Sequence, residues 1–346
     1  MLISTIFSQQ KYTLLTIVLS IVGLAILPGF LPDYALISLI TILMYGILTL
    51  SWTMFSGATN NISLATAALF GIGIYCTAVL HKTLPLPVII LISGLLCFAF
   101  ALLTGLLTLR LKGVYFILFT FGVTALLRNV IQWWEAHITF TVGRHVSGAD
   151  NEIVYGYILA IFAITLLSSF LLRHSSLGMA LQGIGENEDA AEHIGINVTG
   201  VKVIVFACSA IFMGATGAVM ATRWRYIDAG IAFNPLLSFL PVLMAIFGGT
   251  SRLAGPLLGA AFFTVLQEYL ITRYPYLYML LMGVTFIAVI LYLPGGLIIL
   301  AERWWIRVKI RWLMLKARWE RWKVQLNEAI RNWQRIRAEW RVGRKQ

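Results

Sequence analysis

Long apolar stretches follow one another along the first 300 residues, separated by short polar connections. About 20 consecutive apolar residues in helical conformation cross the hydrocarbon core of a bilayer. The pattern therefore predicts an all-α fold: a polytopic transmembrane helix bundle of about ten spans that forms one domain, residues 1–300. The predicted spans are residues 12–30, 34–55, 61–80, 86–109, 113–133, 154–172, 201–222, 235–250, 254–271 and 276–299.

The third and the ninth of these spans have the weakest pattern. Residues 61–80 are rich in Gly and Ala, which also suits a broken or re-entrant helix. Irregular backbone at membrane depth persists only where protein or water covers it. The first apolar run, from about Tyr12 to Leu27, is longer than a usual signal-peptide core and has no small-residue cleavage pattern after it. We therefore expect it to be the first span.

A different pattern governs residues 301–346. Large apolar side chains recur every seven residues, with a second set three residues after most of them, and Lys and Arg fill most other positions. This heptad pattern predicts one long basic amphipathic helix with a Trp-rich stripe. Such a helix either lies on anionic lipid, with its Trp side chains in the membrane interface, or pairs with another helix. We favour the lipid surface, because Trp is unusual at the core positions of a tight dimer. The first set is Trp305, Trp312, Trp319, Leu326, Trp333 and Trp340.

Charge agrees with this division of the chain. Only 12% of the residues are charged and 60% are hydrophobic, yet the net charge is +12. Residues 302–346 carry 14 Lys and Arg against four Glu, so the preceding part is nearly neutral. A neutral apolar body argues against nucleic acid as a partner. The basic tail belongs on the cytoplasmic side by the positive-inside rule, and an even number of spans then puts both termini in the cytoplasm.

Two connections are long enough to carry a function. Residues 134–153 should face outward and residues 173–200 should face the cytoplasm. The inner connection is acidic and should form two short helices, the second ending near Gly195. An acidic helix is unusual beside a membrane surface that attracts basic residues. It is either a solvated loop or a docking element for a protein partner.

Residues 189–195 resemble the EAA-x-x-x-G signature of ABC importer permeases, with Asp189 in place of the leading Glu. The longer segment 173–202 resembles the corresponding loop of branched-chain amino acid permeases of the LivM type, whose pattern includes E-N-E-x-A-A-E-x-x-G-I. In that family the segment is a coupling helix that seats in a groove of the ATPase. The resemblance assigns this role to Glu186, Asn187, Glu188, Asp189, Ala190, Ala191, Glu192 and Gly195.

Three further stretches resemble the same family, so that the likeness covers about residues 12–300. Residues 56–75 resemble G-x-x-x-x-S-L-G-x-A-x-F-x-G-I-G-A-Y, but Ala65 replaces a Gly and the turn at 59–61 departs from the usual glycine turn. Residues 110–116 resemble R-L-x-G-x-Y-F. Residues 248–260 resemble G-G-x-G-x-x-x-G-P-x-x-G-A, with Ser251 in place of a Gly.

Small side chains in the third span give a helix face that allows close packing or leaves room for a solute, and packing is the favoured interpretation. Charges inside predicted spans are functional candidates by default, which singles out Glu268 and Arg128. Arg128 lies near the end of its span, where it can reach water. The candidates for the pathway or its packing are Ser63, Ala65, Ala67, Gly71, Gly73, Tyr75 and Glu268.

The resemblance implies a transport function. The implied partners are two ABC ATPase subunits, a second related permease and an extracytoplasmic solute-binding protein, which the outer loop could contact. The implied solute is a branched-chain amino acid, another amino acid, urea or a small amide, moved by alternating access across a bacterial inner membrane. The chain lacks a Walker motif, so we expect no ATPase activity of its own.

The alternatives are an ATPase-independent channel or secondary transporter for a small polar solute, and a membrane-embedded enzyme. No clustered intramembrane His, Asp or Glu set favours an enzyme. The three Cys and five His show no paired or metal-ligand spacing, so we expect no metal and no cofactor.

Overall fold

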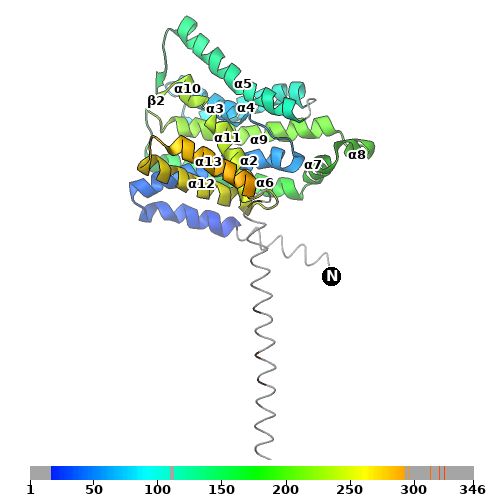
Figure 1. Cartoon of the computed structure of the whole chain (residues 1–346). Helices are drawn as coiled ribbons and strands as arrows, with labels where there is room; N and C mark the ends of the chain where they lie inside the picture. Colours follow the sequence, from blue (N-terminus) through cyan, green and yellow to red (C-terminus); the bar gives the residue numbers. More distant parts are fainter. Residues whose placement is uncertain are drawn as a thin grey trace, which may run out of the picture. The chain divides into compact units, whose positions relative to one another are not determined.

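The computed structural model describes residues 17–109 and 113–292, together with Gly296, Trp312, Trp319 and Lys323. The chain divides into a unit of residues 1–297 and a unit of residues 298–346. The first unit is a bundle of helices (Figure 1). Most of the predicted tail helix lies outside the described residues. Trp312 and Trp319 are described and exposed, and the ammonium of Lys323 lies 5.8 Å from the Trp319 ring centroid.

The bundle consists almost entirely of helices. A 3-10 turn, η1 (Leu27–Phe30), follows the first described helical stretch, and a π-helical turn, η2 (Glu135–Thr139), continues α5. Two two-residue strands, β1 (Arg144–His145) and β2 (Tyr226–Ile227), pair antiparallel. The α-helices are α2 (Asp33–Thr59), α3 (Thr66–Leu80), α4 (Leu86–Thr108), α5 (Val114–Trp134), α6 (Asn151–His174), α7 (Ser176–Glu186), α8 (Glu188–His193), α9 (Val198–Ala221), α10 (Ala229–Ala232), α11 (Leu236–Gly248), α12 (Ala254–Arg273) and α13 (Tyr278–Tyr292).

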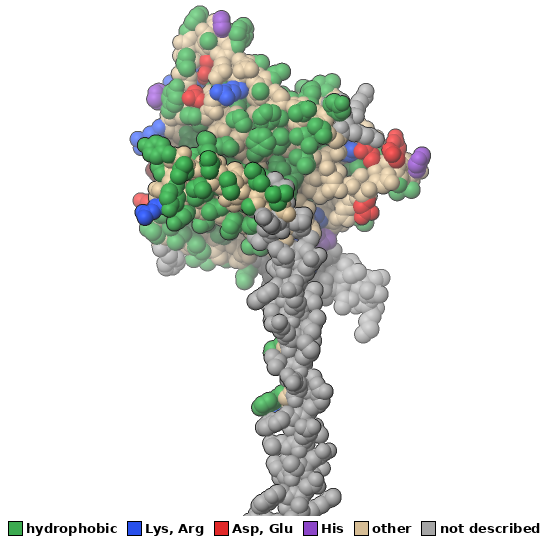
Figure 2. Space-filling model, viewed as in Figure 1, with side chains coloured by type: hydrophobic (Ala, Val, Ile, Leu, Met, Phe, Trp, Pro, Cys, Tyr) green, Lys and Arg blue, Asp and Glu red, His purple; other side chains and the backbone are tan. Residues whose placement is uncertain are grey.

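Seven helical segments among the described residues are long and apolar enough to cross a membrane. They fall on the second, fourth to ninth predicted spans. Shorter apolar helices at Ile17–Gly29, Thr66–Leu80 and Tyr278–Ala288 fall on the first, third and tenth. The polytopic helical bundle is therefore confirmed, whereas the total of ten spans stays a prediction. Apolar side chains cover much of the flank of the bundle, as expected where lipid is the solvent (Figure 2).

Helix α9 lies at the centre, and 78% of its most apolar 18-residue window is buried. Its small residues let neighbouring backbones approach closely. A Cβ on Gly217 would overlap the carbonyl oxygen of Phe70 in α3, and one on Gly214 would overlap the Cys97 thiol in α4. Glycine at these two positions is therefore required by packing.

Helices α11 and α12 form a second close pair. A Cβ on Gly248 would overlap the Gly255 carbonyl oxygen, and a Cβ on Gly259 would overlap that of Met244. Between the helices Gly249 has a φ of 92°, which favours glycine. These glycines serve close helix contact and a tight turn.

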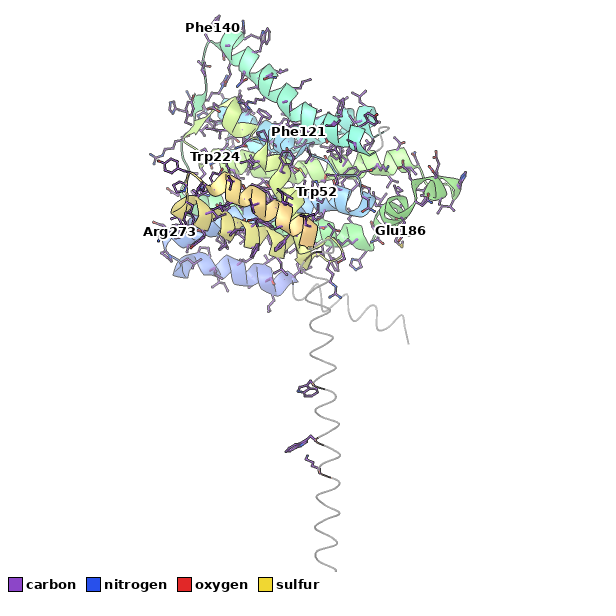
Figure 3. All side chains as sticks on the ribbon, viewed as in Figure 1. Trp52, Phe121, Phe140, Glu186, Trp224 and Arg273 are labelled. Atoms are coloured by element: carbon purple, nitrogen blue, oxygen red, sulfur yellow. The ribbon has the colours of Figure 1, made fainter. Side chains whose placement is uncertain are left out.

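The two long connections lie at opposite ends of the bundle. Helices α7 and α8 project from one end, whereas β2 lies at the other (Figure 1). Glu186 of α7 and Phe140, which follows η2, mark the two ends in Figure 3. Acidic side chains gather on the α7–α8 projection in Figure 2. This arrangement suits one loop on each side of a membrane.

Candidate functional site

The acidic inner connection is a capped, ordered pair of helices. The Ser175 side chain accepts a hydrogen bond from the Gly178 amide at the start of α7, and Asn187 caps α8 in the same way at 3.0 Å. Asn197 caps α9. Such caps satisfy amide groups that the first helical turn leaves unpaired. Gly195 follows α8 with a φ of 88°, so the two predicted helices and their glycine end are confirmed.

The predicted coupling residues divide into two groups. Glu186, Asn187, Asp189, Ala190 and Glu192 are exposed on the projection, where a partner has access to them. The other group faces inward. Ala191 is buried against Ile184 and Val198.

Glu188 lies 2.8 Å from the ammonium of Lys202, a side chain that is only 2% exposed. Lys202 stands near the start of α9, so this ion pair fixes α8 to α9. The resemblance included both residues, but their contact was not predicted. Glu188 therefore holds α8 in place.

The inner connection is joined to the bundle at two further points. The Asn60 amide nitrogen donates to the carbonyl oxygen of Gly185 at 2.9 Å, and a Cβ on Gly185 would overlap the Ala58 carbonyl oxygen. This contact joins α7 to the end of α2. The Arg173 guanidinium donates to the carbonyl oxygens of Thr250 and Ser251, both at 2.9 Å. That contact joins the end of α6 to the turn between α11 and α12.

The irregular segment between α2 and α3 is held by side chains from three helices. Residues 60–65 are not helical, and α3 begins only at Thr66, so the third span is shorter at its start than predicted. The Trp52 indole donates to the Ser63 carbonyl oxygen at 2.8 Å, and the Leu64 amide donates to the Thr120 hydroxyl at 3.0 Å. The Ala67 amide donates to the Ser238 hydroxyl at 3.2 Å. Buried irregular backbone thus has the partners that it requires.

Most of the pathway candidates on the irregular segment and on α3 pack against protein. Ser63, Ala65 and Ala67 are buried. A Cβ on Gly71 would meet the Phe233 ring at 2.5 Å, and one on Gly73 would overlap the Gly214 carbonyl oxygen. These contacts agree with close packing.

Tyr75 is the pathway candidate that borders an open space. It lines an apolar cavity of about 370 Å³ that lies between α3, α4 and α5 and is open at the surface of the bundle, together with Ile72, Cys76, Val79, Leu80, Leu96, Leu127, Ile131, Trp134 and Phe233. The Tyr75 ring stacks on Phe233 with a centroid distance of 5.7 Å. Apart from the Tyr75 hydroxyl and the Cys76 thiol, the lining is hydrocarbon and indole. The cavity therefore suits an aliphatic group.

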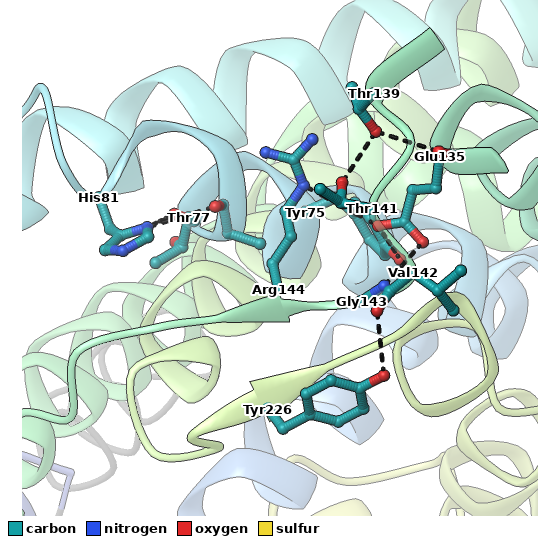
Figure 4. A network of polar contacts seen from close by, with 11 residues as sticks. Tyr75, Thr77, His81, Glu135, Thr139, Thr141, Val142, Gly143, Arg144 and Tyr226 are labelled. Carbon is teal, nitrogen blue, oxygen red and sulfur yellow. Dashed lines mark hydrogen bonds and ion pairs between the residues drawn. The ribbon is translucent and has the colours of Figure 1, made fainter. Parts of the chain in front are cut away.

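A polar network closes over Tyr75 (Figure 4). Glu135, which the sequence analysis did not single out, is only 3% exposed. Its carboxylate accepts a hydrogen bond from the Tyr75 hydroxyl at 3.3 Å and one from the Gly143 amide at 3.4 Å. The Arg144 guanidinium lies 3.9 Å from the carboxylate and 4.9 Å from the Trp134 ring centroid. One carboxylate thus joins α3, the end of α5 and the outer loop.

Glu268, another pathway candidate, lies away from the apolar cavity. It accepts a 2.7 Å hydrogen bond from Ser38, which joins α12 to α2, and neither helix lines the apolar cavity. Nearby, Arg223 donates to the Thr41 hydroxyl at 3.1 Å. Burial lowers the pKa of Arg223, and the Glu268 carboxylate raises it in opposition. We interpret Glu268 as a link between helices.

Known proteins share this sequence pattern. The profile of the family described as branched-chain amino acid transport system / permease component matches residues 34–290. The autoinducer 2 import system permease protein LsrC of Escherichia coli (strain K12 / DH10B) is 24% identical over 278 residues, which cover 74% of this chain and 79% of that protein. The high-affinity branched-chain amino acid transport system permease protein LivM of Salmonella typhimurium is 23% identical over 292 residues, which cover 74% of this chain and 68% of that protein. No solved structure matches.

The family profile thus spans the bundle from α2 to α13 and includes the inner connection, the irregular segment and the polar network. The multi-pass helical architecture agrees with a permease component. The chain belongs to the branched-chain amino acid transport system permease family.

Proposed function

We propose that the chain is the membrane-spanning permease subunit of an ABC importer in a bacterial cytoplasmic membrane, with both termini in the cytoplasm. Separate ATPase subunits grip the exposed acidic face of α7 and α8. A second permease completes the pathway, and a solute-binding protein delivers the solute to the outer loop. The basic tail lies on the lipid surface.

The observation that carries the proposal is the attachment of the inner connection to two different helix pairs. Through Asn60, movement of α7 reaches α2 and the irregular segment that leads into α3. Through Arg173, movement at the end of α6 reaches the turn between α11 and α12. ATP binding would favour one of two arrangements of these helices, because a ligand shifts an equilibrium by its differential affinity. Alternating access follows from this coupling.

The proposed solute is an amino acid with an aliphatic side chain. The relatives do not decide this point, since a permease for autoinducer 2 and one for branched-chain amino acids are about equally identical to the chain. The apolar cavity beside Tyr75 supports an aliphatic group. A polyhydroxylated solute would lose hydrogen bonds to water there without replacing them.

The coupling role can be tested by reversing charge on the exposed face. Asp189→Lys combined with Glu192→Lys should abolish ATP-dependent uptake of labelled leucine in vesicles that contain the ATPases, the second permease and the binding protein. Glu152→Lys, on an exposed outer position, is the matched control and should transport normally. Normal uptake by the double variant would contradict the coupling role, and uptake without the ATPases would favour a channel or secondary transporter.

A further inference from the structure

The cavity beside Tyr75 and the network around Glu135 share a wall. Tyr75 lines the cavity and donates to the Glu135 carboxylate, while Trp134 lines the cavity and lies under the Arg144 guanidinium. Glu135 directly follows Trp134, at the point where α5 becomes the π-helical turn η2. The carboxylate therefore lies beside the cavity, at the end of the lining that α5 provides.

The segment that crosses this end is residues 140–149, here called the outer strap. Its far part is fixed to the segment before and within β2: the Val146 amide donates to the Arg225 carbonyl oxygen at 3.2 Å, and the Ala149 amide donates to that of Thr222 at 3.3 Å. Its near part is held by Glu135 through Gly143 and Arg144, and also by β2, because Arg144 pairs with Ile227 and the Tyr226 hydroxyl donates to the Val142 carbonyl oxygen at 3.3 Å. Loss of the Glu135 side-chain contacts would therefore free the near part of the strap from that carboxylate and leave it joined to β2.

The contacts of the buried Glu135 carboxylate are weak, so they can be broken during transport. The carboxylate is almost fully buried, yet its two hydrogen bonds are long for a charged acceptor, at 3.3 and 3.4 Å, and its cation is 3.9 Å away. Charge-assisted hydrogen bonds are usually about 2.7–2.9 Å. A buried charge with such contacts gains little over its hydrated state, so a competing set of contacts can replace them.

We propose that Glu135 is a positioning residue that holds α5 against α3 beside the cavity in this conformation, by joining Tyr75, the end of α5 and the outer strap. This inference rests on the proposed transport function. In the transport cycle the three parts separate at Glu135, so that α5 moves away from α3 and the cavity widens. The carboxylate itself does not have to contact the solute.

The accessibility of one cysteine can report how wide the cavity is. Cys76 lines the cavity and is partly exposed, whereas Cys97 on α4 is buried. In the assembled transporter, carrying Cys208→Ser, a membrane-impermeant maleimide added outside should label Cys76 slowly. With Glu135→Gln, labelling should be about tenfold faster, because the amide lacks the negative charge and one of the two oxygens that accept hydrogen bonds from Tyr75 and Gly143. Tyr75→Phe, which keeps the ring stacked on Phe233, should give a smaller increase.

Three controls separate gating from unfolding and from the transport assignment. Glu152→Gln makes the same chemical change at an exposed outer position and should leave labelling unchanged. Cys97 should stay unlabelled, since its labelling would mean that the bundle has loosened and that Glu135 is only structural. A non-hydrolysable ATP analogue should change Cys76 labelling in the unmodified protein but not in Glu135→Gln.

Equal labelling of the Glu135→Gln and Glu152→Gln proteins would overturn the proposal. The labelling is read without uptake, so a protein that moves no leucine can still show the Glu135 effect. Failure of the transport assignment is thereby distinguished from failure of this inference.

Discussion

Helix α3 has two neighbours that hold it in opposite ways. Towards α9 the contact is continuous and close, because glycines on both helices face the backbone of the other. Towards α5 the contacts are fewer: the Leu64–Thr120 bond lies just before α3, and the Tyr75–Glu135 bond lies further along it, beside the apolar cavity. In its most apolar window α5 is 17% buried, against 78% for α9. The comparison indicates that α3 is fixed against α9 and can move relative to α5.

The largest effect is expected at the contact between α3 and α9. Gly73→Leu forces a side chain into the backbone of α9 and should lower the free energy of unfolding by at least about 3 kcal/mol, the upper range for overpacked cores. Gly122→Leu on α5 is the matched control, because no atom lies within 4 Å of the added Cβ. Thermal unfolding in detergent measures both. Equal losses of unfolding free energy in the two variants would remove the distinction between the α9 contact and the α5 contact.

The next effect concerns the ion pair under the inner connection. Glu188→Gln leaves the buried Lys202 ammonium without its carboxylate and should cost about 3 kcal/mol, whereas Lys202→Met leaves a half-exposed carboxylate that water can solvate and should cost about 1 kcal/mol. Denaturation monitored by the accessibility of α8 to protease compares the two. The opposite order would mean that Lys202 is hydrated in solution.

A smaller loss is expected where α5 holds the irregular segment. Thr120→Val removes the acceptor of the Leu64 amide and should cost about 2 kcal/mol, because a buried donor loses its partner. Thr124→Val, one turn further along α5, changes a buried hydroxyl for which the structure records no hydrogen-bond partner and should be neutral or stabilising. Thermal unfolding and leucine uptake should separate the pair. A similar loss in both variants would argue against this attachment.

The smallest effect on stability is expected at Asn60. The residue has a φ of 56°, so Asn60→Gly keeps the left-handed backbone and removes only the contact with Gly185. The free energy of unfolding should fall by about 1 kcal/mol. Leucine moved per ATP hydrolysed should fall severalfold if this contact transmits movement. Unchanged coupling would leave Arg173 as the connection that matters.

The periodic parts of this fold could be read from the sequence, and the long-range polar contacts could not. Apolar runs gave the membrane helices, and the composition of residues 173–200 gave two short helices that end at Gly195. The Gly and Ala content of the third span suited a broken or re-entrant helix, but the irregular residues 60–65 precede the Gly- and Ala-rich part, which is helical. Each of these signals is local, so hydropathy and capping chemistry express it directly.

Glu135 shows why the rest was missed. Its partners Tyr75 and Gly143 lie 60 and 8 residues away, and nothing periodic connects a carboxylate at the end of a span with a hydroxyl on another helix. Glu268 attracted attention because it stands inside a span, but its partner Ser38 is 230 residues away. The strands β1 and β2 have two residues each, too few for an alternating pattern.

Helix α7 acts as a lever in the proposed importer. Its 11 residues give a rod about 16 Å long, with the Arg173 anchor just before one end and the Asn60 contact at the other. A tilt on the order of 10° about the first anchor displaces the far end by about 3 Å, which exceeds the stretch that a hydrogen bond tolerates. The end of α2 must then either move with α7 or lose the hydrogen bond between Asn60 and Gly185. Under the proposed coupling, a small rotation of the ATPase subunits would be enough to switch the state of the permease.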